Sequence, residues 1–312
     1  MEKNKLKEQV IFHVGIQIVF AVMFVLGTFY DESIAKAVYS PGDLIAVMVT
    51  TFGIYPFFAS GVLFTGALTE MTVHSGLNKP LKVLFCALCG GLALYSGFSG
   101  SKALMSVDCL GEVFPFLNRN MPVILCVCVI AVYPLFFAGY KLAGKSDDKL
   151  LAKKIIGLIA VMLAALIVME TLKSLFSRPR YRIAVKGYGG IGFVPWYTPF
   201  SGAAEFVASF GLEKTDFRSF PSGHSLLSIS CVYILYSLAW LFPQLKDKQN
   251  LMCICGFIFA VIVMFTRMLL GAHYLSDVSA GAAIGAFLSL IFTLIQHRII
   301  LNGQTVSAEE AK

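Results

Sequence analysis

The sequence predicts an all-α membrane protein, a polytopic transmembrane helical bundle with about eight spans. Of its 312 residues, 57% are hydrophobic and only 14% are charged, and the mean hydropathy is +0.78. A soluble globular domain carries about 25% charged residues, so this chain has too few to cover a water-facing surface. Its apolar residues also come in runs of roughly 20, the length that a helix needs to cross the hydrocarbon core of a bilayer.

Eight apolar segments have the composition of membrane spans. The first follows a basic start (Lys3, Lys5 and Lys7) and is too long for the apolar region of a signal peptide, so we expect it to be a span. The third is short and contains Gly90 and Gly91, which leaves a tilted or re-entrant segment as an alternative. The expected spans are residues 10–30, 43–66, 81–98, 121–143, 154–176, 223–242, 251–271 and 277–297.

The basic residues of the short loops predict that both termini lie in the cytoplasm. Short cytoplasmic loops are enriched in Lys and Arg, and with eight spans the segments 67–80, 144–153 and 243–250 would be cytoplasmic and basic. The long loop over 177–222 breaks this pattern, because it would lie outside. Its basic residues are Arg178, Arg180, Arg182, Lys186, Lys214 and Arg218. Long loops often carry binding residues, so we expect this positive charge to have a chemical role.

Charge and cysteine content argue against two other kinds of protein. The net charge is +7, but no long basic run lies outside the loops between spans, so we expect no nucleic-acid partner. Seven of the eight cysteines lie inside apolar runs, where cysteine behaves as a small hydrophobic residue. We therefore expect packing rather than a disulfide framework. The sequence carries no signal for an oligomeric state.

Three polar clusters lie at the ends of the late spans. Residues 173–180 close the fifth span, residues 221–225 open the sixth, and residues 267–277 join the seventh and eighth. The topology predicted from loop charges puts all three clusters on the extracytoplasmic side. We therefore expect them to form a single site.

The basic residues of these clusters are suited to bind phosphate. Lys173, Arg180 and Arg267 could neutralise the oxygens of one phosphate, and the two guanidinium groups are planar bidentate donors. The Pro-Ser-Gly-His sequence at the start of the sixth span places free backbone N–H groups and the positive end of the helix dipole toward an anion. Together these groups predict a phosphate cradle.

The same clusters contain groups suited to catalysis. His224 and His273 could supply a nucleophile and a general acid. Asp277 follows His273 by four residues, about one helical turn, which is close enough to orient the imidazole. Two other histidines, His13 and His297, are isolated in the sequence, and we interpret them as ordinary polar residues of membrane helices.

The three clusters resemble the signature of the type 2 phosphatidic acid phosphatase (PAP2) family, which includes lipid phosphate phosphatases and glucose-6-phosphatase and shares its site with vanadium haloperoxidases. In that family the first motif is Lys, six residues and Arg-Pro; the second is Pro-Ser-Gly-His; the third is Ser-Arg, five residues, His, three residues and Asp. The second motif is present as Pro221–His224. The third is present as Arg267, His273 and Asp277, with Thr266 in place of serine.

The first motif fits in one respect and departs in another. Arg180 lies at the family's spacing from Lys173, but Tyr181 follows it where the family has proline. The alternative, Arg178-Pro179, keeps the dipeptide and loses the spacing. A charge at the right reach matters more than the proline, so we favour Arg180 as the phosphate ligand and keep Arg178 as a second candidate.

The resemblance covers about residues 154–297 and implies a helical core like that of the PAP2 enzymes and haloperoxidases. It implies His273 as a nucleophile that forms a phosphohistidine, Asp277 as its orienting residue and His224 as the acid for the leaving oxygen. It further implies a phosphate cradle formed by Lys173, Arg180, Arg267 and the backbone of Ser222 and Gly223. Members of the family need neither a metal nor another cofactor, so we expect none here.

The expected activity is hydrolysis of a lipid phosphate or diphosphate at the extracytoplasmic face of the cell membrane. Phosphatidic acid, phosphatidylglycerol phosphate, isoprenyl diphosphates and lipid A phosphates all suit a site at the ends of membrane spans. A lipid phosphotransferase with the same site is the alternative, and a transporter is disfavoured because it has no need of a His–Asp pair. The expected organisation is N-terminal transmembrane helices over 1–150, a catalytic core over 151–300 and a short polar tail over 301–312.

Overall fold

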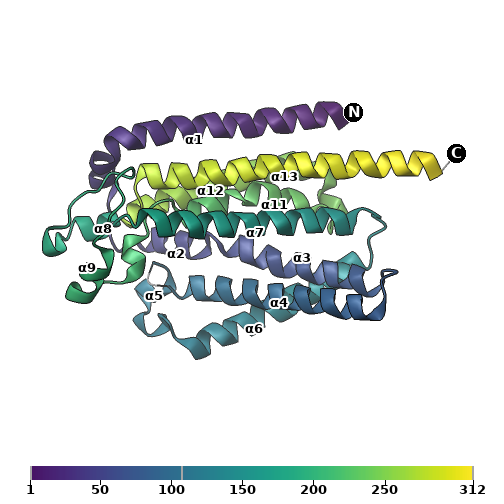
Figure 1. Ribbon diagram of the computed structural model, residues 1–312, viewed down its shortest axis with the longest axis horizontal. Coiled ribbons are helices and arrows are strands. Elements are labelled where there is room, and N and C mark those ends of the chain that lie inside the picture. The colour runs from purple at the N-terminus through teal and green to yellow at the C-terminus, as the bar shows by residue number, and fades with distance from the viewer. Residues whose placement is uncertain (1, 107, 311–312) are drawn as a thin grey trace.

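The structure is a computed structural model that describes residues 2–106 and 108–310. Within these residues all regular secondary structure is helical, which confirms the predicted all-α class. The helices form an elongated bundle, and both ends of the chain lie at the same end of it (Figure 1). This arrangement agrees with the prediction that the two termini share one side of the membrane. Which side that is stays a prediction.

Seven helical segments are long and apolar enough to cross a membrane. They are Leu6–Val38, Leu44–Val73, Lys79–Leu104, Met121–Ala143, Leu151–Ala184, Pro243–Leu269 and Leu275–Ile300. The helices that build them are α1 (Glu2–Val38), α2 (Leu44–Phe52), α3 (Tyr55–Val73), α4 (Lys79–Leu104), α6 (Met121–Ala143), α7 (Leu151–Phe176), α8 (Tyr181–Ala184), η4 (Pro243–Lys248), α12 (Gln249–Leu269) and α13 (Leu275–Glu310). The protein is therefore a multi-pass membrane protein.

Two of the expected spans differ from the helices observed. The segment expected at 223–242 consists of two short helices, α10 (Gly223–Ile229) and α11 (Cys231–Leu238), and it falls below the length of the seven spans. At 1.5 Å per residue it is about 24 Å long, less than the roughly 30 Å of a hydrocarbon core. By contrast, α4 is one continuous helix of 26 residues, so the alternative of a short re-entrant third segment was wrong.

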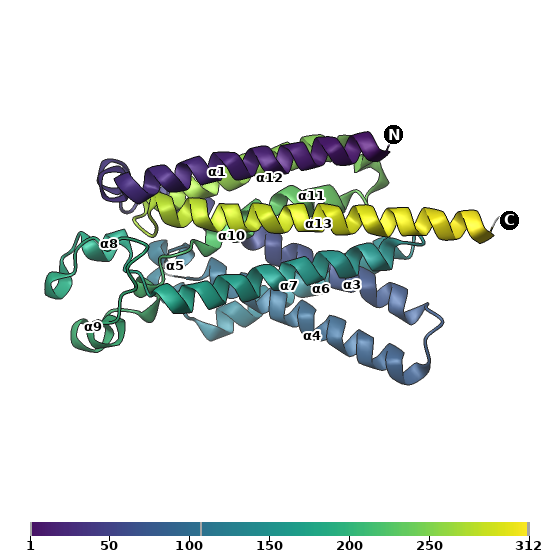
Figure 2. The same cartoon turned by 45° about the horizontal axis from the view of Figure 1, so that its top comes forward.

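The two short helices lie in the middle of the bundle. α10 packs against α13, α12 and α7, and α11 packs against α12. α1 lies along α13, whereas α3, α4 and α6 pack together on the other side of the bundle (Figures 1 and 2). Leu226 and Ile229 of α10 are completely buried, while α4 and α6 expose large apolar side chains such as Leu94 and Val129. An exposed apolar surface of this extent is what a lipid-facing helix presents.

The remaining helices are short and connect the spans. They are α5 (Leu110–Val113), α9 (Ala203–Phe210) and the 3-10 helices η1 (Pro115–Leu117), η2 (Tyr188–Gly190) and η3 (Lys214–Phe217). α8 and α9 lie together at the end of the bundle opposite to the two termini (Figures 1 and 2). The long loop after α7 therefore covers that end.

Two glycines let α13 lie directly on α10. A Cβ atom on Gly281 would lie 2.3 Å from the carbonyl oxygen of Ser222, and one on Gly285 would lie 2.6 Å from the carbonyl oxygen of Leu226. Real Cβ atoms do not approach backbone so closely, so any side chain at Gly281 would force the two helices apart. The close contact fixes the start of α10 against the start of α13.

We expect the substitution Gly281→Ala to lower the free energy of unfolding by about 1–3 kcal/mol, because it overpacks a contact between two backbones. Gly90→Ala is the matched control: it lies in the middle of α4, and nothing lies within 4 Å of its added Cβ. Since alanine favours helix over glycine, that control should be neutral or slightly stabilising. Thermal unfolding of the purified protein in detergent measures both, and equal midpoints would contradict the expectation.

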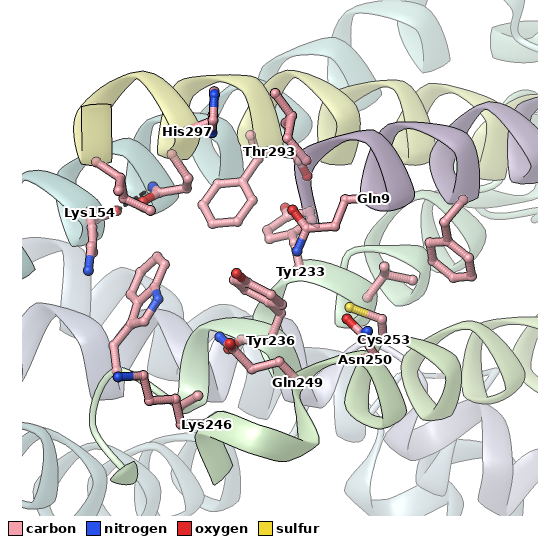
Figure 3. Close-up of a pocket in the computed structure, with 18 of the residues that line it drawn as sticks. Gln9, Lys154, Tyr233, Tyr236, Lys246, Gln249, Asn250, Cys253, Thr293 and His297 are labelled. Atoms are coloured by element: carbon pink, nitrogen blue, oxygen red, sulfur yellow. Dashed lines mark hydrogen bonds between the residues drawn. The ribbon is translucent and has the colours of Figure 1, made fainter. Parts of the chain in front are cut away.

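A cavity of about 820 Å³ lies at the end of the bundle that holds the two termini. It is lined by side chains of α1, α7, α11, α12 and α13, among them Gln9, Lys154, Tyr236 and Thr293 (Figure 3). The cavity forms because α11 ends at Leu238 while the helices around it continue. No residue of the three motif clusters lines it.

Candidate active site

The three motif clusters meet at the end of the bundle opposite to this cavity. Backbone hydrogen bonds join them directly. The N–H of Ser222 in the second cluster donates to the carbonyl oxygen of Asp277 in the third, at 2.9 Å. The N–H of Arg182, just after the first cluster, donates to the carbonyl oxygen of Gly271, also at 2.9 Å. The structure therefore brings the three clusters together at one end of the molecule.

Aromatic side chains within the long loop over 177–222 pack against one another. The rings of Phe200 and Phe217 stack with their centroids 5.6 Å apart, and those of Trp196 and Phe220 stack at 5.4 Å. Stacked aromatic pairs of this kind add to the burial of apolar surface. These stacked aromatic pairs stabilise the conformation of the loop that carries the arginines.

His273 is buried beside the carboxylate that the sequence predicts as its orienting residue. Its side chain is 1% exposed, and Nδ1 lies 3.7 Å from Oδ2 of Asp277, a distance longer than a hydrogen bond. The same Oδ2 accepts hydrogen bonds from the hydroxyl of Ser219 at 2.5 Å and from the N–H of Tyr274 at 2.8 Å. The carboxylate is therefore fixed on the Nδ1 side of the imidazole, and Nε2 is the ring nitrogen that does not face it.

The surroundings of His273 favour its neutral form. Burial lowers the pKa of this imidazole to about 3, and the charges of Arg267 and Arg180 act in the same direction, against the opposing effect of Asp277. At neutral pH the ring is therefore unprotonated. A neutral imidazole has a free electron pair, which a nucleophile requires.

Arg178, the second candidate for the first motif, forms ion pairs and hydrogen bonds with side chains of the protein itself. Its guanidinium is completely buried and donates to Oδ1 of Asp277 at 2.6 Å, to Oδ2 of Asp31 at 3.0 Å and to the hydroxyl of Ser276 at 2.9 Å. It also lies over the ring of Tyr274, 4.0 Å from the centroid. In this structure the guanidinium of Arg178 therefore supports the carboxylate of Asp277.

Asp31 is a residue of this network that the sequence analysis missed. It lies in α1, is 2% exposed, and accepts hydrogen bonds from both the N–H and the hydroxyl of Ser276. α1 reaches the start of α13 because Gly27 lies against it: a Cβ atom on Gly27 would be 2.5 Å from the nitrogen of Ser276. Asp31 directly follows the span expected over residues 10–30, and the observed span continues to Val38 and therefore includes this carboxylate. Ionisable residues inside membrane spans usually have a functional role.

A second carboxylate, Asp108, lies among the arginines that face the site. It comes from the turn between α4 and α5 and pairs with the guanidinium groups of Arg180 and Arg182, and with Nη2 of Arg267 at 2.7 Å. Burial alone would raise the pKa of Asp108, but the three guanidinium groups outweigh it and hold that pKa well below its usual range. Asp108 is therefore ionised at any working pH. The sequence analysis did not identify it.

Arg182 forms ion pairs with two carboxylates of this site. Besides Asp108, its guanidinium pairs with Asp216 at 2.7 Å. Asp216 belongs to η3, and its backbone carbonyl accepts the N–H of Arg180 at 2.9 Å. Arg182 therefore links Asp216 of the long loop to Asp108 of the arginine cluster.

The start of α10 offers part of the predicted backbone cradle. The hydroxyl of Ser222 caps the helix by accepting the N–H of Ser225 at 3.3 Å, and the N–H of Ser222 is used by Asp277. The N–H of Gly223 is the first of the helix and has no acceptor within it. A Cβ atom on Gly223 would lie 2.9 Å from Nζ of Lys173, so the ammonium group lies directly over this glycine. Of the two predicted backbone donors, Gly223 remains.

Several nitrogens of the predicted site residues are buried without a hydrogen-bond partner in the described part of the chain. They are Nε of Arg180, Nε and Nη1 of Arg267, Nε2 of His224 and both ring nitrogens of His273. These groups lie near one another, since the charges of His273, Arg267 and Lys173 all act on His224. Buried polar groups are nearly always hydrogen-bonded in native proteins. Such a concentration of donors suits a ligand with several oxygens.

Comparison with known proteins gives matches over the same region. The sequence model of the PAP2 superfamily matches residues 154–300. A lipid A 1-phosphatase of Rhizobium johnstonii is 30% identical over 246 residues, which cover 75% of this chain and 90% of the relative. A lipid A 1-phosphatase of Rhizobium etli is 30% identical over 178 residues, 56% of this chain and 66% of that relative. Phosphatidylglycerophosphatase B of Bacillus subtilis is 39% identical over 80 residues, 25% of this chain and 37% of the relative.

No solved structure matches the chain significantly. The superfamily match, the lipid phosphatase relatives and the apolar helices support a membrane lipid phosphatase. The relative from Rhizobium johnstonii is matched over most of its length, and the superfamily model covers all three motifs. The chain belongs to the PAP2 superfamily, as its motifs predicted.

Proposed function

We propose that the protein hydrolyses the terminal phosphate of a membrane lipid through a phosphohistidine on His273. The observation that carries this proposal is the position of His273, which is buried against Asp277 at one end of the bundle. Unpaired nitrogens of Arg180 and Arg267 accompany it. A nucleophile, its orienting carboxylate and a set of anion-binding donors are the groups that phosphoryl transfer requires.

In the first step Nε2 of His273 attacks the phosphorus in line with the oxygen of the lipid. The bond between phosphorus and that oxygen breaks while His224 gives it a proton, so the lipid leaves as an alcohol, or as a monophosphate when the substrate is a diphosphate. The carboxylate of Asp277 stabilises the positive charge that develops on the imidazole. Its position is supported by Arg178 and by the hydroxyl of Ser219.

In the second step water attacks the phosphorus of the phosphohistidine. His224 now takes a proton from the water, the bond between phosphorus and Nε2 breaks, and inorganic phosphate leaves. His273 returns to its neutral form. His224 thus acts first as an acid and then as a base.

The cradle for the phosphate oxygens consists of Arg180, Arg267, Lys173 and the N–H of Gly223. Arg180 is favoured over Arg178 because the guanidinium of Arg178 is occupied by two carboxylates. Three positive side chains offset the charge of the phosphate in a buried site, where electrostatic stabilisation is strong. A metal ion is therefore not needed for this role, and we propose a metal-independent reaction.

The substrate that we propose to test first is a lipid A 1-phosphate, because the relative matched over 75% of this chain is a lipid A 1-phosphatase. Phosphatidic acid, phosphatidylglycerol phosphate and isoprenyl diphosphates present the same terminal phosphate and stay as alternatives. The loop charges support an extracytoplasmic position of the site, with both termini in the cytoplasm.

Release of inorganic phosphate from a panel of these four lipids tests the proposal. The full-length protein in detergent should release phosphate from at least one of them, with inhibition by vanadate and without loss of rate in EDTA. No release from any lipid would contradict hydrolysis. Label that passes from the lipid to an added lipid acceptor without free phosphate would instead identify a phosphotransferase. Inactivation by EDTA that divalent cations reverse would contradict metal independence.

A further inference from the structure

Asp108 contacts both arginines that we assign to the phosphate cradle. Its Oδ2 is shared by Nη1 of Arg180 and Nη2 of Arg267, the arginines of the first and third motifs, and its Oδ1 pairs with Nη1 of Arg182. Carboxylate and phosphate are the two anions that guanidinium groups bind through paired N–H donors. One carboxylate therefore occupies Nη1 of Arg180 and Nη2 of Arg267, part of the two guanidinium groups that a substrate would need, while Nε of Arg180 and Nε and Nη1 of Arg267 are left without a partner in the described part of the chain.

Asp108 differs from the other buried carboxylates of the site in whether its arginine partners also pair with a second carboxylate. Arg178 has Asp31 and Asp277, and Arg182 keeps a pair with Asp216. Within residues 2–106 and 108–310, Arg180 and Arg267 form ion pairs with Asp108 alone. The charge of Asp108 is thus directed at the two motif arginines.

The turn that carries Asp108 does not depend on the carboxylate. The carbonyl oxygen of Ser106 accepts the N–H groups of Cys109 and Gly111, both at 3.0 Å, and these backbone bonds close the turn. Among the residues that the structure describes, the side chain of Asp108 forms hydrogen bonds only with arginines of the cluster. Rotation about its two side-chain torsions would therefore withdraw the carboxylate while the backbone of the turn stays closed.

We propose that Asp108 is an intramolecular competitor of the substrate's phosphate. In the free protein the carboxylate of Asp108 pairs with Arg180 and Arg267. It moves away from these arginines when a phosphate enters, and it pairs with them again as inorganic phosphate is released. The inference rests on the proposed function, since it takes these arginines as phosphate ligands. A competitor in the same chain reduces the fraction of binding-competent protein, so it raises the dissociation constant of every anion by the same factor.

The test measures anion binding apart from turnover. Asp108→Asn is combined with His273→Ala, which removes the nucleophile, and the binding of orthophosphate and of pyrophosphate is measured by calorimetry on the full-length protein in detergent. We expect Asp108→Asn to lower both dissociation constants by about tenfold or more, and by the same factor. Glu112→Gln is the matched control, because it removes the same charge from an exposed position in the same segment and should change neither constant.

Unchanged or weaker binding in Asp108→Asn would overturn the proposal, and so would factors that differ between the two anions. Asp108→Ser, which has a smaller side chain, is a second test and must change both dissociation constants by the same factor as Asp108→Asn. Neutral variants that fold only in the presence of phosphate would support the proposal, because phosphate then supplies the missing charge. Aggregation that phosphate does not prevent would make Asp108 a structural residue and contradict it.

The outcomes also separate this inference from the proposed function. Tighter phosphate binding in Asp108→Asn, with no hydrolysis of any lipid by the unaltered protein, would keep the competitor and reject the enzyme. Lipid hydrolysis by the unaltered protein, with no change of binding in Asp108→Asn, would keep the enzyme and reject the competitor.

Discussion

Replacing His273 with alanine should reduce turnover by about 10⁴-fold or more, because the phosphoryl group then has no nucleophile to attack it. The same change should abolish the acid-labile, alkali-stable phosphoenzyme that a phosphohistidine gives when the reaction with radiolabelled substrate is stopped. His297→Ala is the matched control, since His297 lines the cavity at the other end of the bundle. It should keep both the turnover and the phosphoenzyme.

The complementary variant is His224→Ala. With p-nitrophenyl phosphate, whose leaving group needs no protonation, it should still form the phosphoenzyme but hydrolyse it slowly, by about 10²–10⁴-fold. Phosphoenzyme should therefore accumulate, with a burst of nitrophenol in rapid-quench measurements. A phosphoenzyme that persists in His273→Ala, or that fails to accumulate in His224→Ala while turnover remains normal, would reject the assigned roles.

Replacing Asp31 with alanine should lower the free energy of unfolding by about 3–5 kcal/mol, the usual effect of removing one partner of a buried ion pair. Arg178 would lose one of its two carboxylates, and Ser276 would lose the acceptor of its N–H and hydroxyl. Because Asp31 acts through Arg178 on Asp277, and not on the phosphate, kcat should fall while KM changes little. Unfolding in detergent and steady-state kinetics measure the two effects.

The neighbouring Glu32 provides the control for this variant. It lies on the exposed side of α1, so Glu32→Ala should change stability by no more than about 0.5 kcal/mol and leave kcat unaltered. Asp31→Asn should recover part of the stability, because the amide oxygen still accepts from Ser276. An Asp31→Ala protein with the stability and kcat of the Glu32→Ala protein would contradict the support that we assign to Asp31.

The sequence predicted those parts of the site that depend on local spacing. His273 and Asp277 are four residues apart, so a single turn of backbone fixes their relation. The convergence of Arg180, Arg267 and Pro221–His224 required only that the helix ends carrying them lie at the same end of the bundle. Hydropathy and loop charge supplied that information.

What the sequence did not reveal depends on contacts between distant segments. Asp31 meets Ser276 across 245 positions of the chain, and Asp108 meets Arg267 across 159, distances over which one sequence carries no pairing information. The choice between Arg178 and Arg180 likewise depends on the path of the backbone after Ser177, which leaves α7 in the left-handed region. Spacing alone cannot give that path.

The sixth span is shorter than expected for a different reason. The apolar run that predicted a span over 223–242 continues to Phe242, but the helix ends at Leu238, because hydropathy reports the environment of a residue and not its backbone conformation. The shortness of this central segment therefore became visible only in three dimensions.

The two carboxylates that contact the motif arginines from outside residues 154–300 limit how this protein can be divided. A chimera that joins this segment to the leading helices of a relative would receive both histidines but would lose Asp31 and Asp108. Arg180 and Arg267 would then be buried without the counter-charge of Asp108, and Arg178 would keep Asp277 but lose Asp31. Any exchange of parts, or any shortened form made for crystallisation, has to carry α1 and the turn before α5 along with the segment that bears the motifs.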